Sequence, residues 1–239
     1  MNKRTPRSPA APKKSPLPAV APRGKILVVD DHPMTRAGVV QLLSKQLDLE
    51  VCGEASNPAE ALRLLPQCRP GLVLADISMP GRSGAEFIKD VLTLHANLPI
   101  LVVSMHDELI YAERMLRAGA RGYVMKEAGG EELLVAIRQV LGGQVYVSKR
   151  MSARLLDAMT GHRPRGSSSP IEKLSDREFE VFQLIGQGKG TREIAQQLHL
   201  SPKTVDVHRS HIREKLELKE ATALVRHAVR WMETQGMGG

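Results

Sequence analysis

Short apolar runs alternate with longer stretches of helical periodicity in the first half of this chain, and this alternation restricts the folds open to it. Four such runs are present, KILVV, LVLA, PILVV and GYVM. Runs that are short and continuously apolar are typical of parallel strands buried on both faces. The first half is therefore predicted to form an α/β domain around a parallel sheet.

Each apolar run is followed by polar residues that could carry chemistry. In chain order these are the pair Asp30 and Asp31, then Asp76, Ser104 and Lys126. In a parallel α/β sheet, groups at the carboxyl ends of the strands gather along one edge. Two acids to hold Mg²⁺, a third acid as nucleophile, and a hydroxyl and a cation to face phosphoryl oxygens are what phosphoryl transfer to a carboxylate requires.

An ordinary explanation exists for each of these residues taken singly. Asp31 could be a helix cap before His32 and Pro33, and Lys126 alone would be read as a solvated lysine. The five residues together, at the ends of four separate apolar runs, favour the functional interpretation.

The motifs around these residues resemble those of response-regulator receiver domains. They are VVDDHP at 28–33, DISMPGRSG at 76–84, VVSMHDE at 102–108 and ARGYVMK at 120–126, and the resemblance spans most of residues 24–145. It implies a flavodoxin-like, doubly wound sheet of five parallel strands. It also implies that Asp76 is the phospho-accepting residue and that Lys126 bridges to the phosphoryl group.

The same resemblance implies a metal site and a conformational switch. Mg²⁺, with Mn²⁺ as the alternative ion, would be held by Asp30, Asp31, Asp76 and the backbone carbonyl of Ile77. Ser104 and Tyr123 would form the switch pair, with Tyr123 turning inward when Ser104 moves toward the phosphoryl group.

The periodicity changes after residue 145. A helix is predicted at 148–159, followed by a flexible segment rich in Gly, Ser and Pro at 161–170. Ser175 and Glu178 then form a capping box that opens a helix. Thr191 is expected to cap the next helix, and Ser201, followed by Pro202, the one after it. A helix, a tight turn and a second capped helix are the parts of a helix-turn-helix.

The second helix of this pair has two distinct faces. Val205, Ile212 and Leu216 lie on one stripe and are predicted to be core. The opposite face mixes polar residues with one small apolar residue, as base reading requires, because a thymine methyl needs an apolar contact. This outward face consists of Lys203, Asp206, Val207, Ser210 and Glu214. Arg209 and Arg213 flank the core stripe, from where they could reach phosphates.

The stretch LSDREFEVFQLIGQGKGTREIAQQLHLSPKTVDVHRSHIREKL resembles the LuxR-type helix-turn-helix, from residue 174 to about 235. A receiver followed by this four-helix, all-α module is the layout of NarL/FixJ-type response regulators, which are transcription factors. The resemblance places base contacts on Asp206, Val207 and Ser210. The full set of expected DNA contacts is Lys203, Thr204, Asp206, Val207, Arg209, Ser210 and Arg213.

The layout also implies partners. These are double-stranded DNA, a histidine kinase, and a second copy of the chain once it is phosphorylated. The last helix pairs the DNA-binding domains in this family, but Trp231 within it could equally be core, and both readings stay open.

The net charge of +8 is unevenly distributed. Residues 1–23 carry six basic residues and no acid, whereas residues 174–239 carry 10 basic and 9 acidic residues. The tail is rich in Pro and Ala and is expected to be disordered, a solvated extension rather than a DNA-binding arm. The chain lacks an apolar stretch long enough for a membrane helix and a signal-peptide core, so a cytoplasmic location is expected. The two cysteines are expected to be free.

Two other functional classes are less consistent with the residues. A phosphatase that uses Asp76 as nucleophile commonly carries a second acid two residues later, where this chain has Ser78. A small-molecule sensor would need an aromatic pocket, and aromatic residues make up only 3%. We therefore expect a regulator that is not an enzyme. Its parts are a tail at 1–23, a receiver at 24–145, a linker with a short helix at 146–173 and the DNA-binding domain at 174–239.

Overall fold

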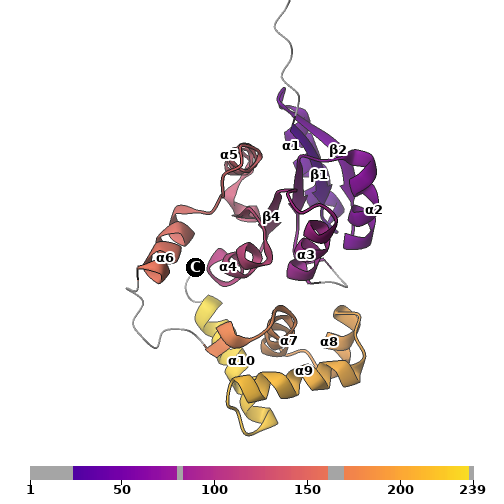
Figure 1. Cartoon of the computed structure of the whole chain (residues 1–239). Coiled ribbons are helices and arrows are strands. Elements are labelled where there is room, and N and C mark those ends of the chain that lie inside the picture. The colour runs from indigo at the N-terminus through magenta and orange to yellow at the C-terminus, as the bar shows by residue number, and fades with distance from the viewer. Residues whose placement is uncertain (1–23, 80–82, 161–169, 237–239) are drawn as a thin grey trace, which may run out of the picture.

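A computed structural model describes residues 24–79, 83–160 and 170–236. The predicted disordered tail at 1–23, and nearly all of the predicted flexible segment at 161–170, lie outside these residues. Figure 1 shows the α/β half of the chain above the helical half, with α4 and α7 at the level where the two meet.

The first half forms a five-stranded parallel sheet in the order β2-β1-β3-β4-β5. Its strands are β1 (Gly24–Val29), β2 (Leu49–Ala55), β3 (Leu72–Ala75), β4 (Ile100–Ser104) and β5 (Gly122–Met125). The four predicted apolar runs are β1, β3, β4 and β5. No apolar run marked β2, because only its first and last residues are fully buried at this edge of the sheet.

Helices cover both faces of the sheet. They are α1 (Pro33–Ser44), α2 (Pro58–Cys68), α3 (Gly84–Leu94), α4 (Glu108–Ala118) and α5 (Gly130–Leu141). Ile26 and Val28 of β1 point to one core, together with Leu43 of α1 and Ile137 of α5. Alternate strand residues point to a second core with α2, α3 and α4. The doubly wound α/β prediction is confirmed.

The second half is helical. After α6 (Lys149–Met159) and a short 3-10 turn, η2 (Pro170–Lys173), it contains α7 (Asp176–Gly186), α8 (Thr191–Gln197), α9 (Pro202–Lys215) and α10 (Ala221–Gly236). The Ser175–Glu178 capping box is present at the start of α7, and Ser201 caps α9. The prediction that Thr191 caps α8 is wrong. Gly190 is the cap, because Glu193 accepts a hydrogen bond from its backbone N–H at 2.7 Å.

The two halves pack against each other between α4 and α7. Arg114 of α4 donates hydrogen bonds to the carbonyls of Ile171 and Leu174, both at 2.8 Å, and its guanidinium lies 4.3 Å from the ring centre of Phe179. Buried apolar residues form one continuous cluster from the sheet through α4 into the helical half. The domain arrangement is thus fixed by apolar burial and by charge-assisted hydrogen bonds to backbone.

Candidate functional site

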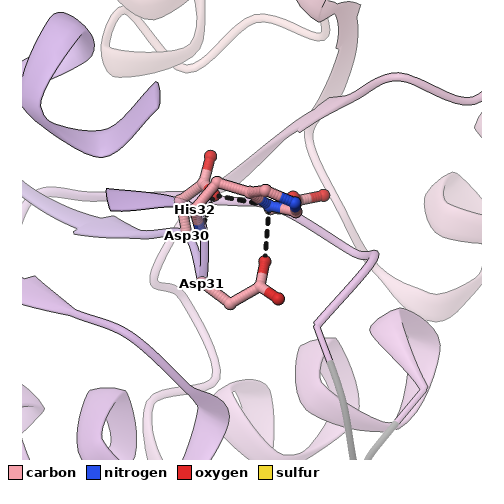
Figure 2. Close-up of side chains that lie close together, drawn as sticks. Asp30, Asp31 and His32 are labelled. Carbon is pink, nitrogen blue, oxygen red and sulfur yellow. Dashed lines mark hydrogen bonds and ion pairs between the residues drawn. The ribbon is translucent and has the colours of Figure 1, made fainter. Parts of the chain in front are cut away.

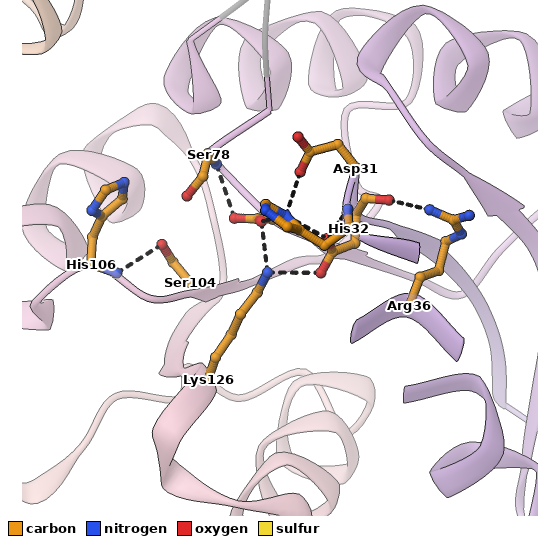
Figure 3. Close-up of polar contacts among 9 residues, drawn as sticks. Asp31, His32, Arg36, Ser78, Ser104, His106 and Lys126 are labelled. Atoms are coloured by element: carbon orange, nitrogen blue, oxygen red, sulfur yellow. Dashed lines mark hydrogen bonds and ion pairs between the residues drawn. The ribbon is translucent and has the colours of Figure 1, made fainter. Parts of the chain in front are cut away.

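The polar residues that follow the apolar runs meet at one edge of the sheet. Asp30 and Asp31 follow β1, Asp76 follows the adjacent β3, and Lys126 follows β5. Asp76 and Asp30 are only 2% and 5% exposed, so their charges need partners inside the protein. Figure 3 shows Asp31 and Lys126 approaching the same site from different strand ends.

Lys126 links the two buried carboxylates. Its ammonium group lies 2.8 Å from Asp30 Oδ2 and 2.7 Å from Asp76 Oδ2. Burial alone would lower the pKa of Lys126, but the hydrogen bonds and charges of Asp30 and Asp76 outweigh it and raise the pKa. The lysine therefore stays charged and partly neutralises the acidic cluster.

Backbone groups fix the orientation of both acids. Asp76 Oδ1 accepts a hydrogen bond from the N–H of Ser78 at 2.9 Å, and Asp30 Oδ1 accepts one from the N–H of His32 at 2.8 Å. The guanidinium of Arg36 in turn donates to the Asp30 carbonyl oxygen at 2.6 Å. Both oxygens of each carboxylate are thereby held in place, which leaves little rotational freedom at Asp76.

The donor set fits a divalent cation. Ligand atoms of Asp30, Asp31, His32 and Asp76 all lie within 4.8 Å of one another. Asp31 Oδ1 is buried without a hydrogen-bond partner, an arrangement that costs free energy unless a cation or water satisfies the oxygen. Three carboxylates are the oxygen ligands that Mg²⁺ prefers. Sequence reasoning missed His32, although its position next to the acidic pair was a signal. A role for the Ile77 carbonyl stays a prediction.

The predicted switch residues are both buried. Ser104 is 0% and Tyr123 1% exposed. The backbone N–H of His106 donates to Ser104 Oγ at 3.1 Å, and the Tyr123 hydroxyl donates to the His106 carbonyl at 2.8 Å. Burial raises the pKa of Tyr123, so its hydroxyl keeps its proton. Tyr123 already occupies the inward position that the sequence prediction reserved for the phosphorylated form.

A chain of contacting rings runs from His106, beside the predicted switch pair, to the helical half. The imidazole of His106 stacks on Tyr111 with ring centres 4.4 Å apart, and Tyr111 meets the edge of Phe179 at 5.4 Å. Phe179 in turn meets Trp231 of α10 at 5.6 Å. Trp231 is half-buried and also contacts Phe182 at 5.7 Å, which supports its role in the core. His106, which is hydrogen-bonded to both predicted switch residues, therefore also stacks on a residue of the interface between the two halves.

A cavity of about 340 Å³ lies between the acidic site and the helical half. Asp31, Ser78 and His106 line it from the α/β side, and Gln183 and Gln197 are among the residues opposite. A molecule that reaches the acidic site through this cavity therefore contacts helices of the second half. No local sequence pattern predicted this arrangement, because it joins residues about 70 to 170 positions apart.

The outward face of α9 is accessible in this arrangement. Lys203, Asp206, Val207 and Ser210 are exposed, Val207 to 45%, whereas the predicted core residue Val205 is fully buried. Of the remaining predicted DNA contacts, Thr204, Arg209 and Arg213 are half-buried. In Figure 1, α9 lies on the side of the helical half that faces away from the sheet. The domain contact does not cover this face.

Asp206 has a partner within its own domain. Its Oδ1 accepts a hydrogen bond from the Thr191 hydroxyl of α8 at 3.3 Å. The contact ties the start of α8 to α9 and gives Asp206 a structural role beside the predicted base contact.

Comparison with known proteins agrees with both halves of this description. The family "Response regulator receiver domain" matches residues 26–138, and "Bacterial regulatory proteins, luxR family" matches residues 172–228. The oxygen regulatory protein NreC of Staphylococcus carnosus is 36% identical over 210 residues, covering 86% of this chain and 97% of the relative. The chain belongs to the response regulators with a LuxR-type DNA-binding domain.

Further relatives of this response regulator are similar along their length. NreC of Staphylococcus haemolyticus is 35% identical over 86% of the chain and 97% of the relative. A two-component response regulator of the LuxR family from Aurantimonas is 30% identical, with a TM-score of 0.54, over 58% of this chain and 99% of that structure. RcsB of Salmonella enterica, solved bound to promoter rprA with phosphomimetic BeF3⁻, shares the fold at TM-score 0.62 and 24% identity, over 87% and 98% of the two chains.

As a member of this family, the protein is a transcriptional response regulator of a two-component system and not an enzyme. Within its described residues, no helix has both the length and the apolar character needed to cross a bilayer.

Proposed function

We propose that Asp76 accepts a phosphoryl group from the phosphohistidine of a partner kinase. A carboxylate oxygen of Asp76 attacks phosphorus in line, the P–N bond to the kinase histidine breaks, and the phosphoryl group moves to the aspartate. The observation that carries this proposal is the Lys126 ammonium held 2.7 Å from Asp76 Oδ2. A fixed cation there stabilises the charge that develops on the transferring group.

The neighbouring acids support the same step. Asp30, Asp31 and Asp76, together with the proposed Ile77 carbonyl, would hold Mg²⁺, or Mn²⁺ in its place, and a bound ion would supply positive charge beside the phosphoryl oxygens. Ser104 lies fully buried at the end of β4 and offers a hydroxyl to the same oxygens. The backbone N–H of Ser78 keeps the Asp76 carboxylate oriented before transfer.

The second half of the proposal concerns DNA. We place α9 in the major groove of double-stranded DNA, with Asp206, Val207 and Ser210 facing base edges. Phosphate contacts would come from Lys203, Thr204, Arg209 and Arg213. Exposure of the outward face supports this assignment, because a helix that enters the groove must present this face freely.

Phosphorylation is proposed to act by pairing two chains rather than by uncovering α9. The outward face of α9 is already exposed while α4 and α7 are in contact, so uncovering it would change little. Loosening of the contact between α4 and α7 would instead uncover the part of α10 around Trp231, which lines a cavity together with Ile110 and Arg114 of α4. A homodimer held through α10 would read paired half-sites.

The remaining assignments follow from these partners. The cytoplasm is the proposed location, because the DNA target and the kinase domain are reached there. The proposed boundaries are 24–145 for the receiver, 146–173 for the linker and 174–239 for the DNA-binding domain.

Incubation with acetyl phosphate and Mg²⁺ tests the acceptor. The wild-type chain should gain the mass of one phosphoryl group, and Asp76→Asn should gain none. Asp90→Asn serves as the matched control, because Asp90 lies on α3, away from the strand ends, and this variant should be phosphorylated like the wild type. Phosphorylation of Asp76→Asn would refute the assignment. Sedimentation of the phosphorylated wild type as a monomer with unchanged DNA affinity would refute the pairing step.

A further inference from the structure

His32 contributes a nitrogen to the acidic site. Its Nδ1 lies 2.8 Å from Asp31 Oδ1, 3.5 Å from Asp30 Oδ1 and 4.0 Å from Asp76 Oδ2. Figure 2 shows the ring lying directly beside the two acids that follow β1. Among the described residues, this is the one group of acids and histidines placed to share an ion.

These spacings suit ligands of one cation. Two ligands about 2.1 Å from a metal lie about 3 Å apart at a right angle and about 4.2 Å apart when they are opposite each other. The three distances from His32 Nδ1, from 2.8 to 4.0 Å, fall close to this range. The imidazole therefore needs little rearrangement to bind an ion held by the carboxylates.

The contact between His32 and Asp31 is close without being a good hydrogen bond. Asp31 Oδ1 is buried and has no aligned donor, although His32 Nδ1 is 2.8 Å away. The buried carboxylate oxygen lacks a partner, and the ring nitrogen faces the same space. An ion between them would satisfy both atoms at once.

The local backbone explains why the ring is available. His32 is the N-cap of α1, and its side chain makes no capping hydrogen bond. Its backbone N–H donates to Asp30 Oδ1, which fixes the residue beside the acids. The side chain is 63% exposed, so the other ring nitrogen can stay hydrated while Nδ1 points to the carboxylates.

From these observations we infer that His32 Nδ1 is an additional ligand at the acidic site for divalent cations that accept nitrogen, such as Mn²⁺ and Ni²⁺. The inference rests on the proposed metal site and goes beyond it. Imidazole binds transition-metal ions well, whereas Mg²⁺ keeps to oxygen ligands and water. His32 therefore shifts the site toward transition-metal dications relative to one built from carboxylates alone.

Electron spin-echo envelope modulation of Mn²⁺ bound to the full chain tests this directly, since it detects a coordinated nitrogen. The wild type should show nitrogen modulation, and His32→Asn should not. Asn is a favoured N-cap residue, so the variant keeps the start of α1. His95→Asn, the same change at the exposed C-cap of α3, is the control and should keep the modulation.

Calorimetric titration gives a second readout. His32→Asn should weaken Ni²⁺ binding by about tenfold or more, because even residues behind metal ligands commonly contribute about that factor. Mg²⁺ binding should change much less. Nitrogen modulation that is absent from the wild type or survives in His32→Asn would overturn the inference, as would an equal loss of Ni²⁺ and Mg²⁺ affinity. Failure of the proposed function would appear separately, as no Mg²⁺-dependent mass gain in the wild type.

Discussion

The Tyr111 hydroxyl of α4 donates a hydrogen bond to the side-chain oxygen of Gln183 on α7, across the boundary between the two domains. The same tyrosine ring stacks on His106, whose backbone carbonyl accepts a hydrogen bond from the predicted switch residue Tyr123. Tyr111 thus contacts both His106 and the DNA-binding domain. A change at the proposed phosphorylation site that moves His106 would therefore be transmitted through Tyr111 to α7.

Tyr111→Phe should loosen the contact between the domains while leaving each domain folded. The variant removes only the hydroxyl, and loss of one such hydrogen bond is worth about 1 kcal/mol. Trp231 is the single tryptophan and packs on Phe179 at this interface, so its fluorescence emission should shift to longer wavelength. Tyr146→Phe is the matched control, because that hydroxyl pairs with Glu132 inside the receiver at 2.8 Å. Equal emission spectra for both variants would show that the Tyr111 hydroxyl does not couple the two domains.

Lys126→Met should destabilise the receiver. The substitution leaves the buried Asp30 and Asp76 without their shared cation, and breaking a buried ion pair from one side costs about 3 kcal/mol or more. Urea denaturation without divalent cations measures the loss in the free energy of unfolding. Adding Asp76→Asn to Lys126→Met should recover part of it, since one of the unpaired charges is then gone. Strictly additive effects of the two substitutions would show that Lys126 and Asp76 do not interact energetically.

Substitutions on α9 should separate sequence reading from general DNA affinity. Val207→Ala and Ser210→Ala alter the exposed outward face and should change the preferred sequence selected from a random DNA pool. Arg213→Ala should weaken binding to every sequence and reduce the salt dependence by about one unit of slope, as expected for one lost phosphate contact. If Val207→Ala and Ser210→Ala leave the preference unchanged, α9 is not the reading helix.

Glu180 should make stability fall as the pH rises from about 4.5 to about 7. Burial raises its pKa from 4.5 to about 7, with Arg177 only partly opposing the shift. The folded chain therefore keeps a proton that the unfolded chain has lost. This contribution is fully present below the unfolded pKa and is lost as the pH rises through the folded one.

Melting temperatures measured from pH 4.5 to 8 test the Glu180 prediction. Glu180→Gln should flatten the profile between pH 5 and 7, because its side chain no longer titrates. Relative to Glu180→Gln, the wild type should have its highest melting temperature at low pH. Parallel profiles across the whole range would contradict the assignment of the shift to Glu180.

Much of the fold and the acidic site could be predicted from sequence because the signals are local. A strand buried on both faces must be continuously apolar, and this requirement marked β1, β3, β4 and β5. Parallel strands place their carboxyl ends on one edge, so residues as far apart as Asp30 and Lys126 could be expected to meet. The helix starts at Ser175 and Ser201 were predictable because capping acts within one turn.

Other features depend on tertiary contacts that no local sequence pattern predicts. β2 is an edge strand with half-exposed residues, so its burial pattern is set by what packs beside it and not by its own sequence. His32 follows the acidic pair directly in sequence, but only the fold brings its ring close to Asp76 as well.

The docking of α7 on α4 joins Tyr111 and Gln183, which are 72 residues apart. By itself, then, the sequence determined the two domains, the positions of four of the five strands along the chain and the residues at their ends, because those depend on local periodicity and capping. The tertiary structure alone decided the edge strand, the fourth potential ligand and the contact between domains. The edge strand and the ligand position depend on packing within the receiver, and the contact between domains exists only once both domains have folded and docked, because each requires burial and hydrogen bonding that a local stretch of chain does not have.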